Sequence, residues 1–228
     1  MQEGKAQTHT RRTQLERRAD AESRLLHAAR AIVAEKGWTG MTLAEVGEAA
    51  GYSRGLAAHH FGNKAGLLRA LAAYVNTCFA ADLKAMSRRR EGEVTLKGII
   101  QAYFSGSADS WTNNRALLAL LSEAVTQEGE CREILVQHTH GNIEYLTRLI
   151  ETGMASGDMR SDITAPAAAA LILGVMRGVM LQHLLKPDEA ALGAIQEQLL
   201  CLIDMAFAAP AAKAPGSGRR QGTTHVID

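Results

Sequence analysis

The chain has 228 residues, of which 46% are hydrophobic and 21% charged, a balance that is ordinary for a soluble globular protein of one or two domains. Aromatic residues make up only 4%, whereas Ala and Leu are abundant, so we expect an all-α fold. Three widely separated cysteines, Cys78, Cys131 and Cys201, form no paired motif, which argues against a disulfide framework and for reduced thiols.

The net charge of +1 excludes a uniformly basic chain, but the charge is unevenly distributed. Residues 1–90 carry 15 Lys and Arg against 8 Asp and Glu, and residues 91–228 carry 10 against 16. A basic N-terminal part suits a polyanionic partner, and an acidic C-terminal part would avoid it. Chance asymmetry is the alternative explanation. The N-terminus has no apolar segment typical of a signal peptide, so we expect a cytoplasmic protein.

The first predicted elements are short and well delimited. Residues 1–18 are polar and rich in arginine, and we expect a disordered basic arm there, with a similar disordered tail over 209–228. A helix is predicted over about 20–36, ended by Gly37. Thr42, followed three residues later by Glu45, predicts a capping box that opens a short helix ended by Gly51.

Two further caps follow. Ser53 is expected to cap a second short helix reaching about residue 59, and Asn63 a long helix reaching about residue 89. The rest of the chain predicts longer amphipathic helices, for a total of about nine, near residues 94–110, 114–127, 130–155, 166–185 and 188–208.

The helix predicted over 166–185 lies in the most apolar stretch of the chain. Its length and composition would suit a membrane span. Arg177, Gln182 and His183 interrupt the stretch, which favours a buried helix of a soluble protein instead.

The segment 42–61 combines two short capped helices with a tight turn around Gly51, which is the geometry of a helix-turn-helix. In such a unit the second helix enters the major groove of DNA. Arg54 can reach guanine edges or phosphate, and the small Gly55 and Ala57 allow close approach. Two ordinary short helices of an all-α protein are the alternative reading.

The stretch from Gly37 to Leu68 resembles the TetR/AcrR family of bacterial transcription regulators. The resemblance rests on the order and spacing of Met41-Thr42, Glu45-Val46, Ala49-Ala50-Gly51-Tyr52-Ser53, Arg54-Gly55-Leu56, His60-Phe61, Asn63-Lys64 and Leu67-Leu68. It covers about residues 20–70, whereas the remainder is similar only in being all-helical and of similar length.

The resemblance implies a homodimer that presents two recognition helices to a palindromic operator, usually as a repressor that a small apolar or amphipathic effector releases. It implies a DNA-binding domain over 19–67 and a helical ligand-binding and dimerisation domain over 68–208. The DNA contacts carried over by position are Thr42, Ser53, Arg54, Gly55, Ala57, His59, His60 and Lys64.

Two positions depart from the family pattern. Gly47 stands where the family prefers Ala, at a cost of about 1 kcal/mol to a short helix unless close packing needs it. Ala58 stands where a phosphate-contacting Tyr is common, so one contact is missing. The basic arm is a candidate to supply additional phosphate or minor-groove contacts.

The last two predicted helices suggest a dimer interface. Gly174 and Gly178 share one face of the first, which permits close helix approach. The stripe predicted on the second consists of Leu192, Ile195, Leu199 and Leu202. An intramolecular core is the alternative for these residues.

An effector pocket is predicted from apolar and aromatic side chains with a few polar groups between the helices. The candidates are Tyr103, Phe104, Trp111, Glu123, His138, Asn142, Tyr145, Met176, Met180 and His183. Ordinary core packing or surface exposure is the alternative for each of them. No metal or cofactor is predicted: His138 and His140, two residues apart on a helix, point to different faces.

Two other function classes are possible for an all-helical chain. A helical enzyme finds no support, because the sequence has no Gly-rich phosphate loop, no H-E-x-x-H and no Glu-x-x-His pairs of the di-iron kind. A module that uses this fold only to dimerise is disfavoured by the presence of Ser53, Arg54 and Lys64.

Overall fold

The computed structural model describes residues 13–90, 95–105, 108–126 and 128–209. Within these ranges the chain forms nine α-helices and no strand. The helices are α1 (Gln14–Lys36), α2 (Leu43–Ala49), α3 (Leu56–Phe61), α4 (Lys64–Arg90), α5 (Leu96–Phe104), α6 (Ala108–Thr126), α7 (Glu130–Ser156), α8 (Ala165–Leu185) and α9 (Glu189–Phe207). The predicted all-α fold with about nine helices is therefore confirmed.

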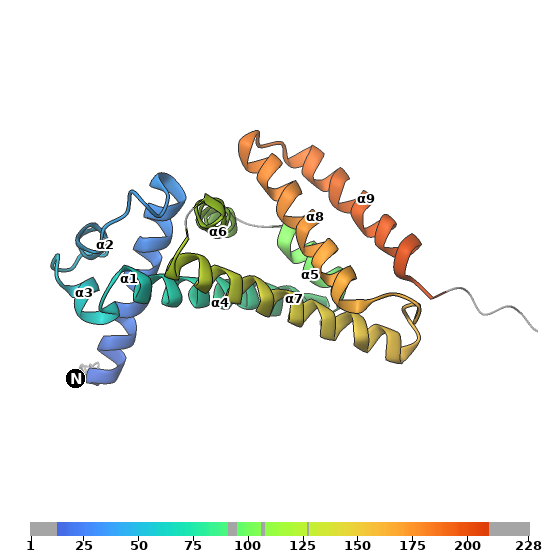
Figure 1. The fold of residues 1–228 in the computed structure, drawn as a ribbon, viewed down its shortest axis with the longest axis horizontal. Coiled ribbons are helices and arrows are strands. Elements are labelled where there is room, and N and C mark those ends of the chain that lie inside the picture. Colours follow the sequence, from blue (N-terminus) through green and yellow to red (C-terminus); the bar gives the residue numbers. More distant parts are fainter. Residues whose placement is uncertain (1–12, 91–94, 106–107, 127, 210–228) are drawn as a thin grey trace, which may run out of the picture.

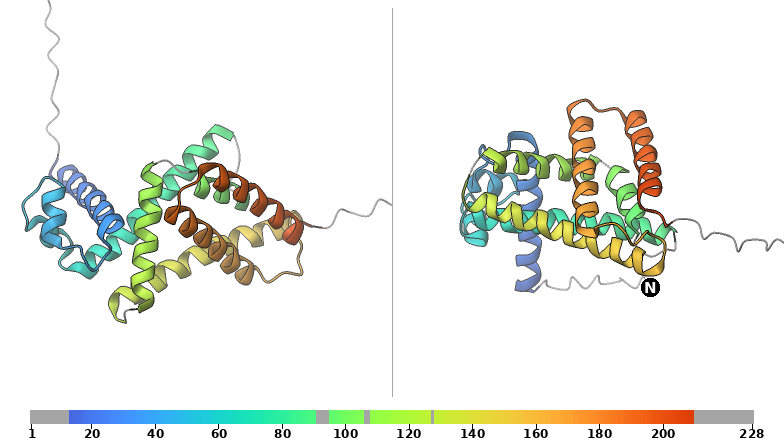
Figure 2. Two further views of the ribbon diagram at one scale, coloured as in Figure 1. Left: turned by 90° about the horizontal axis from the view of Figure 1, so that it is seen from above. Right: turned by 45° about the vertical axis from the view of Figure 1, so that its right-hand side comes forward.

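The helices form an elongated molecule with a small head at one end (Figure 1). The head consists of α1, α2 and α3, while α4 and α7 run lengthwise away from it. Helices α8 and α9 form an antiparallel pair at the opposite end. Helix α6 lies across the molecule between the head and this pair, as the view from above in Figure 2 also shows.

Helix α1 begins earlier than predicted. Thr13 forms a reciprocal capping box with Glu16: the Glu16 N–H donates to the Thr13 hydroxyl at 3.2 Å, and the Thr13 N–H donates to the Glu16 carboxylate at 2.8 Å. This cap makes residues 14–18 helical, so the prediction of a disordered arm up to residue 18 is wrong for them. The arm's first twelve residues and the tail from residue 210 lie outside the described residues.

Two hydrophobic clusters hold the described helices together. The first lies beneath the head and includes Leu25, Val46, Ala57 and Leu68, but also Leu120 of α6. The second is built mainly from α5, α7, α8 and α9. Helix α6 is thus packed into the core of the head although it lies in the C-terminal half of the sequence. The division at residue 67 stays a prediction.

The junction between α5 and α6 differs from the predicted one. A single helix over about 94–110 was expected, but α5 ends at Phe104, and α6 begins at Ala108. Asn113, expected at a junction, lies inside α6 and is only 6% exposed. Its side chain accepts a buried hydrogen bond, so a residue typical of turns is retained here by a tertiary contact.

Helices α8 and α9 are long and apolar enough to cross a membrane by length and composition alone. In the most apolar window of α8, 33% of the residues are buried, against 17% for α9. Ala169, Ile172, Met176 and Met180 place the inner face of α8 in the second hydrophobic cluster, as expected for a helix that packs on a protein core.

Candidate nucleic-acid interface and internal cavity

The turn between α2 and α3 is held by a close backbone contact. Gly51 has a φ of +80°, and the N–H of Tyr52 donates to the carbonyl of Gly47 at 2.9 Å. A Cβ on Gly47 would lie 2.5 Å from the carbonyl oxygen of Ser53. The glycine that departs from the family pattern is therefore required by close packing, because any side chain would separate the two helices.

The caps of the two short helices are simpler than predicted. The Thr42 hydroxyl accepts from the N–H of Glu45 at 3.2 Å, as expected. The Glu45 carboxylate turns instead to the ammonium of Lys36, so half of the expected capping box is present. Helix α3 begins at Leu56 with Gly55 as its N-cap and no side-chain cap, so the prediction that Ser53 caps it is wrong.

Most of the predicted DNA contacts form an exposed edge of the head. Thr42, Ser53, Gly55 and His59 are exposed, and His60 is half-buried. The Arg54 side chain is 76% exposed and lies 3.3 Å from the carboxylate of Glu48. Exposed ion pairs contribute little to stability, so this guanidinium is available to exchange its carboxylate for a phosphate.

Ala57 and Phe61 form the inner side of the same helix. Ala57 is fully buried in the core of the head, so the prediction that it contacts DNA is wrong. Its methyl group leaves room for the helix to lie flat on the core. Phe61 is partly buried and packs against that core.

Lys64 is engaged within the head. Its ammonium donates to the carbonyl of Thr39 at 3.2 Å and lies 5.1 Å from the centre of the Trp38 ring. Asn63 caps α4 as predicted, with its side-chain oxygen accepting from the N–H of Gly66 at 2.8 Å. If Lys64 contacts a DNA phosphate, its ammonium must bind the phosphate and the loop after α1 at the same time, or leave that loop.

Glu123 of α6 holds the same loop from the other side. Its carboxylate accepts from the N–H of Trp38 at 2.7 Å, from the N–H of Thr39 at 2.9 Å and from the Thr39 hydroxyl at 2.8 Å. Gly37, with a φ of +75°, lets the backbone approach, because a Cβ there would lie 2.5 Å from a Glu123 carboxylate oxygen. Glu123 is therefore a strut between α6 and the head, and the prediction that it lines a pocket is wrong.

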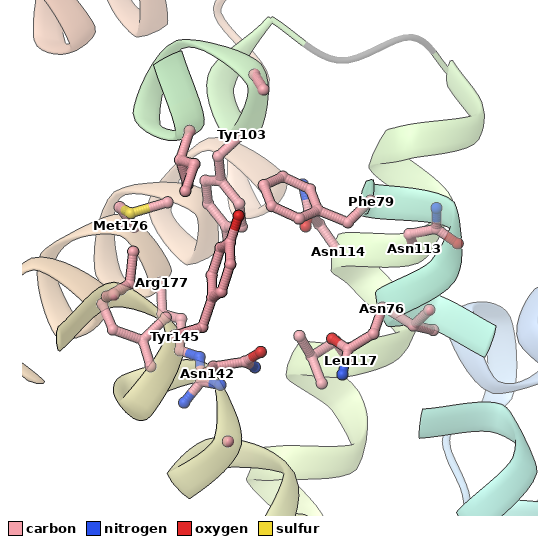
Figure 3. Close-up of a pocket in the computed structure, with 16 residues that line it drawn as sticks. Asn76, Phe79, Tyr103, Asn113, Asn114, Leu117, Asn142, Tyr145, Met176 and Arg177 are labelled. Carbon is pink, nitrogen blue, oxygen red and sulfur yellow. The ribbon is translucent and has the colours of Figure 1, made fainter. Parts of the chain in front are cut away.

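A cavity of about 400 Å³ lies between α4, α5, α6, α7 and α8 (Figure 3). Its walls are mostly apolar, with amide side chains and one guanidinium among them. The lining residues are Val75, Asn76, Phe79, Ile99, Ala102, Tyr103, Asn113, Asn114, Leu117, Gly141, Asn142, Tyr145, Leu146, Leu173, Met176 and Arg177.

Four of the ten predicted pocket residues line this cavity: Tyr103, Asn142, Tyr145 and Met176. Five more predicted residues lie outside the cavity, so the prediction is wrong for them as it is for Glu123: Phe104, Trp111, His138, Met180 and His183. Phe104 and Met180 are buried in the second hydrophobic cluster, and Trp111 packs against the buried His183 with ring centres 5.2 Å apart. His138 lies beside the lining, 3.0 Å from the Asn76 side-chain oxygen.

Arg177 lines the cavity although it was not predicted to, and in the sequence its charge indicates only an interruption of an apolar helix. The amides of Asn76, Asn113 and Asn114 line the cavity too and were not predicted either. The Asn113 side-chain oxygen accepts from the guanidinium of Arg30 in α1 at 2.8 Å, and Arg30 is only 1% exposed. The cavity wall is thus joined directly to the first helix of the head.

The predicted dimer stripe divides between two faces of α9. Leu192 and Leu199 are 3% and 8% exposed and pack into the subunit's own core, so they are wrongly placed at an interface. Ile195 and Leu202 are 39% and 52% exposed. On α8 a Cβ added to Gly174 or Gly178 would meet nothing within 4 Å, so this face is open to a neighbouring helix.

Two family models match the chain. One describes bacterial regulatory proteins of the tetR family and matches residues 25–71. The other describes the C-terminal part of BetI-type transcriptional repressors and matches residues 93–208, about half of the chain. Together they cover most of the head and four of the five helices that surround the cavity, while the lining part of α4 falls between the two matches.

Curated relatives agree with these matches. The HTH-type transcriptional regulator CymR of Pseudomonas putida is 47% identical over 60 residues. These residues span only 26% of this chain and 30% of CymR. The HTH-type transcriptional regulator BetI of Burkholderia thailandensis is 29% identical over 165 residues, covering 69% of this chain and 81% of BetI.

Solved structures share the fold. A TetR-family transcriptional regulator from Rhodococcus sp. superposes with a TM-score of 0.73 at 23% identity, covering 82% of this chain and 98% of that one. A transcriptional regulator from Saccharomonospora viridis in complex with choline gives 0.66 at 17% identity, covering 84% and 100%. With an exposed helix-turn-helix edge, a matching head and a matching C-terminal part, the chain belongs to the tetR family of bacterial regulatory proteins, which are transcription regulators and not enzymes.

Proposed function

We propose that this transcription regulator is a cytoplasmic repressor that binds a palindromic operator as a homodimer and leaves it when a small effector enters the cavity. The exposed edge formed by Ser53, Arg54 and His59 carries the proposal for DNA. It stands over a rigid core, and its arginine is held only by an exposed ion pair. The basic N-terminal part of the chain adds favourable charge toward a phosphate backbone.

The operator proposal is tested by fluorescence anisotropy on a duplex from the region upstream of the chain's own gene. Arg54→Ala should weaken specific binding by roughly ten- to hundredfold, the usual loss for an arginine at a base or phosphate. Arg148→Ala, which removes an exposed arginine in the second half of α7, is the matched control and should bind as the wild type. Equal affinity of Arg54→Ala and the wild type would contradict the proposed interface.

The dimer proposal rests on the large apolar side chains that α8 and α9 expose. On α8, Leu171, Val175 and Leu185 are 62%, 36% and 78% exposed, and Gly174 and Gly178 lie in the same helical stripe. On α9, Ile195, Leu202 and Met205 are exposed as well. Such a large exposed apolar face is typical of an interaction surface. Two copies packed through these helices would form a four-helix interface.

Light scattering tests the dimer. The wild type should have twice the 24.5 kDa mass of one chain, and Gly178→Arg should have the mass of one. Glu197→Arg places the same charge on an exposed position of α9 and serves as the control. A dimeric Gly178→Arg would contradict the proposed interface.

The effector proposal rests on the position of α6. Its Asn113 lines the cavity and holds Arg30 of α1, and its Glu123 holds the loop after α1. A ligand that shifts α6 therefore acts on both of these hydrogen-bonded contacts with the head at once. The choline complex of the relative from Saccharomonospora viridis supports a small-molecule ligand for this fold, without specifying the ligand of this chain.

A further inference from the structure

The cavity contains a cation that nothing in the described part of the chain neutralises. Among the described lining residues, Arg177 is the only one with a formal charge. Its Nε and Nη2 atoms are buried and have no hydrogen-bond partner there, and Nη1 reaches the Thr139 hydroxyl only at 3.4 Å. A largely buried guanidinium with only one long hydrogen bond is costly, so this one is a ready site for an anion.

The titratable neighbours of Arg177 do not supply that anion. Burial raises the pKa of Tyr103 to about 12 even though Arg177 opposes the shift, so the phenol stays neutral at pH 7. Burial and then Arg177 lower the pKa of His138 to about 4, so the imidazole is neutral as well. Burial also lowers the pKa of Arg177 itself, but an arginine remains charged in proteins.

The rest of the cavity suits a small amphipathic molecule. Figure 3 shows Arg177 beside Asn142 and Tyr145 on one side of the cavity, with Phe79 and Leu117 across it. A guanidinium fork matches the two oxygens of a carboxylate, and neighbouring amides can donate to the same group. The apolar walls would then enclose the body of the molecule, and about 400 Å³ lies within the usual range for small-ligand sites.

We propose that the effector is a small carboxylic acid with an apolar or aromatic body, whose carboxylate is bound by Arg177. This inference rests on the proposed function, in which the cavity is the effector site. The competing ligand is a quaternary ammonium ion, since Phe79, Tyr103 and Tyr145 offer aromatic faces of the kind that bind such ions. Arg177 disfavours that ion by repulsion, and no carboxylate lines the described cavity to attract it.

Isothermal titration calorimetry on the full chain without DNA tests the inference with matched probes. The first set is 3-phenylpropanoate, 3-phenylpropanamide and 2-phenylethyl-trimethylammonium, and the second is 4-methylpentanoate with its amide. Each carboxylate should bind at least about tenfold more tightly than its amide, because the amide loses the charge-assisted pairing. The ammonium ion should bind more weakly than either.

Two variants assign the preference to Arg177. Arg177→Met removes a buried charge, should fold, and should bind carboxylate and amide equally. Arg177→Lys keeps the positive charge but lacks the planar pair of guanidinium donors, so it should prefer the carboxylate over the amide less strongly than the wild type does. Arg148→Met, at an exposed position of α7, is the control and should behave as the wild type.

The inference is overturned by any of three results: an amide or the ammonium ion binding as tightly as the carboxylate, a carboxylate preference that survives in Arg177→Met, or no carboxylate binding in the millimolar range. Operator binding is measured on the same preparation. Retained operator binding with failed carboxylate binding refutes only the ligand class. Failed operator binding refutes the proposed function, whatever the cavity binds.

Discussion

Replacing Glu123 by Ala removes the strut between α6 and the head. The carboxylate accepts three hydrogen bonds of 2.7, 2.9 and 2.8 Å, and hydrogen bonds to charged groups contribute about 1.5–3 kcal/mol each. The two groups of Thr39 are exposed and turn to water in the variant, so most of the loss comes from the half-buried Trp38 N–H. We therefore expect a free energy of unfolding lower by about 2 kcal/mol, and a Tm lower by about 4–8 °C.

Thermal unfolding followed by circular dichroism measures this loss. Glu123→Gln should fall between the variant and the wild type, because its amide keeps one acceptor oxygen but turns a donor toward one N–H. Glu151→Ala, at an exposed position within α7, is the control and should shift the Tm by little. A Tm of Glu123→Ala no lower than that of Glu151→Ala would refute the role of Glu123 as a strut.

Two further predictions test the head and the cavity wall. Gly47→Ala should lower the free energy of unfolding by about 1–3 kcal/mol, since its Cβ would meet the Ser53 carbonyl oxygen at 2.5 Å; Gly193→Ala, in open space on α9, should raise it by about 0.5–1 kcal/mol. Equal Tm shifts would contradict the close contact. The second concerns His138, whose pKa lies at about 4, below the ordinary 6.5, because of burial and Arg177. The unfolded chain takes up a proton between these values and the folded chain does not, so stability is lost as the pH falls from about 6.5 toward 4. His138→Gln should show a smaller fall in Tm over that range, and an unchanged fall would contradict the burial of a neutral imidazole.

The head could be predicted from the sequence because its signals are local. The hydroxyl of Thr42, the side chain of Asn63 and the positive φ of Gly51 act within a few residues, so the pattern of caps and glycines locates the helices. The close approach that makes Gly47 necessary is also nearby, yet the sequence indicates only an unusual residue. Which atom the glycine makes room for depends on how the two helices cross.

The proposed dimer face was only partly predictable because α9 is apolar on two adjacent faces. Residues three apart lie roughly 60° from each other around a helix, so Leu192 and Ile195 share one broad stripe in the sequence. The packing of α9 on its own subunit buries Leu192 and leaves Ile195 exposed. Only the rotation of the helix, set by tertiary contacts, separates core from surface here.

The cavity was the least predictable part because five helices contribute to it. Met176 and Met180 are one turn apart on α8, yet only Met176 lines the cavity, whereas Met180 is fully buried in the core. Arg177 did carry a signal, as a charge inside an apolar helix. A charge inside an otherwise apolar helix is costly unless a partner or ligand compensates it, so it can indicate a binding site as well as argue against a membrane span.

The most direct test of the account is a footprint of the purified chain on the DNA upstream of its own gene, at moderate salt and with competitor DNA. The account predicts one protected palindrome, with two half-sites about one helical turn apart or a multiple of it, occupied by two chains. Protection should disappear in Arg54→Ala. Uniform, sequence-independent protection that weakens with salt alone would contradict the claim that this chain is an operator-specific regulator.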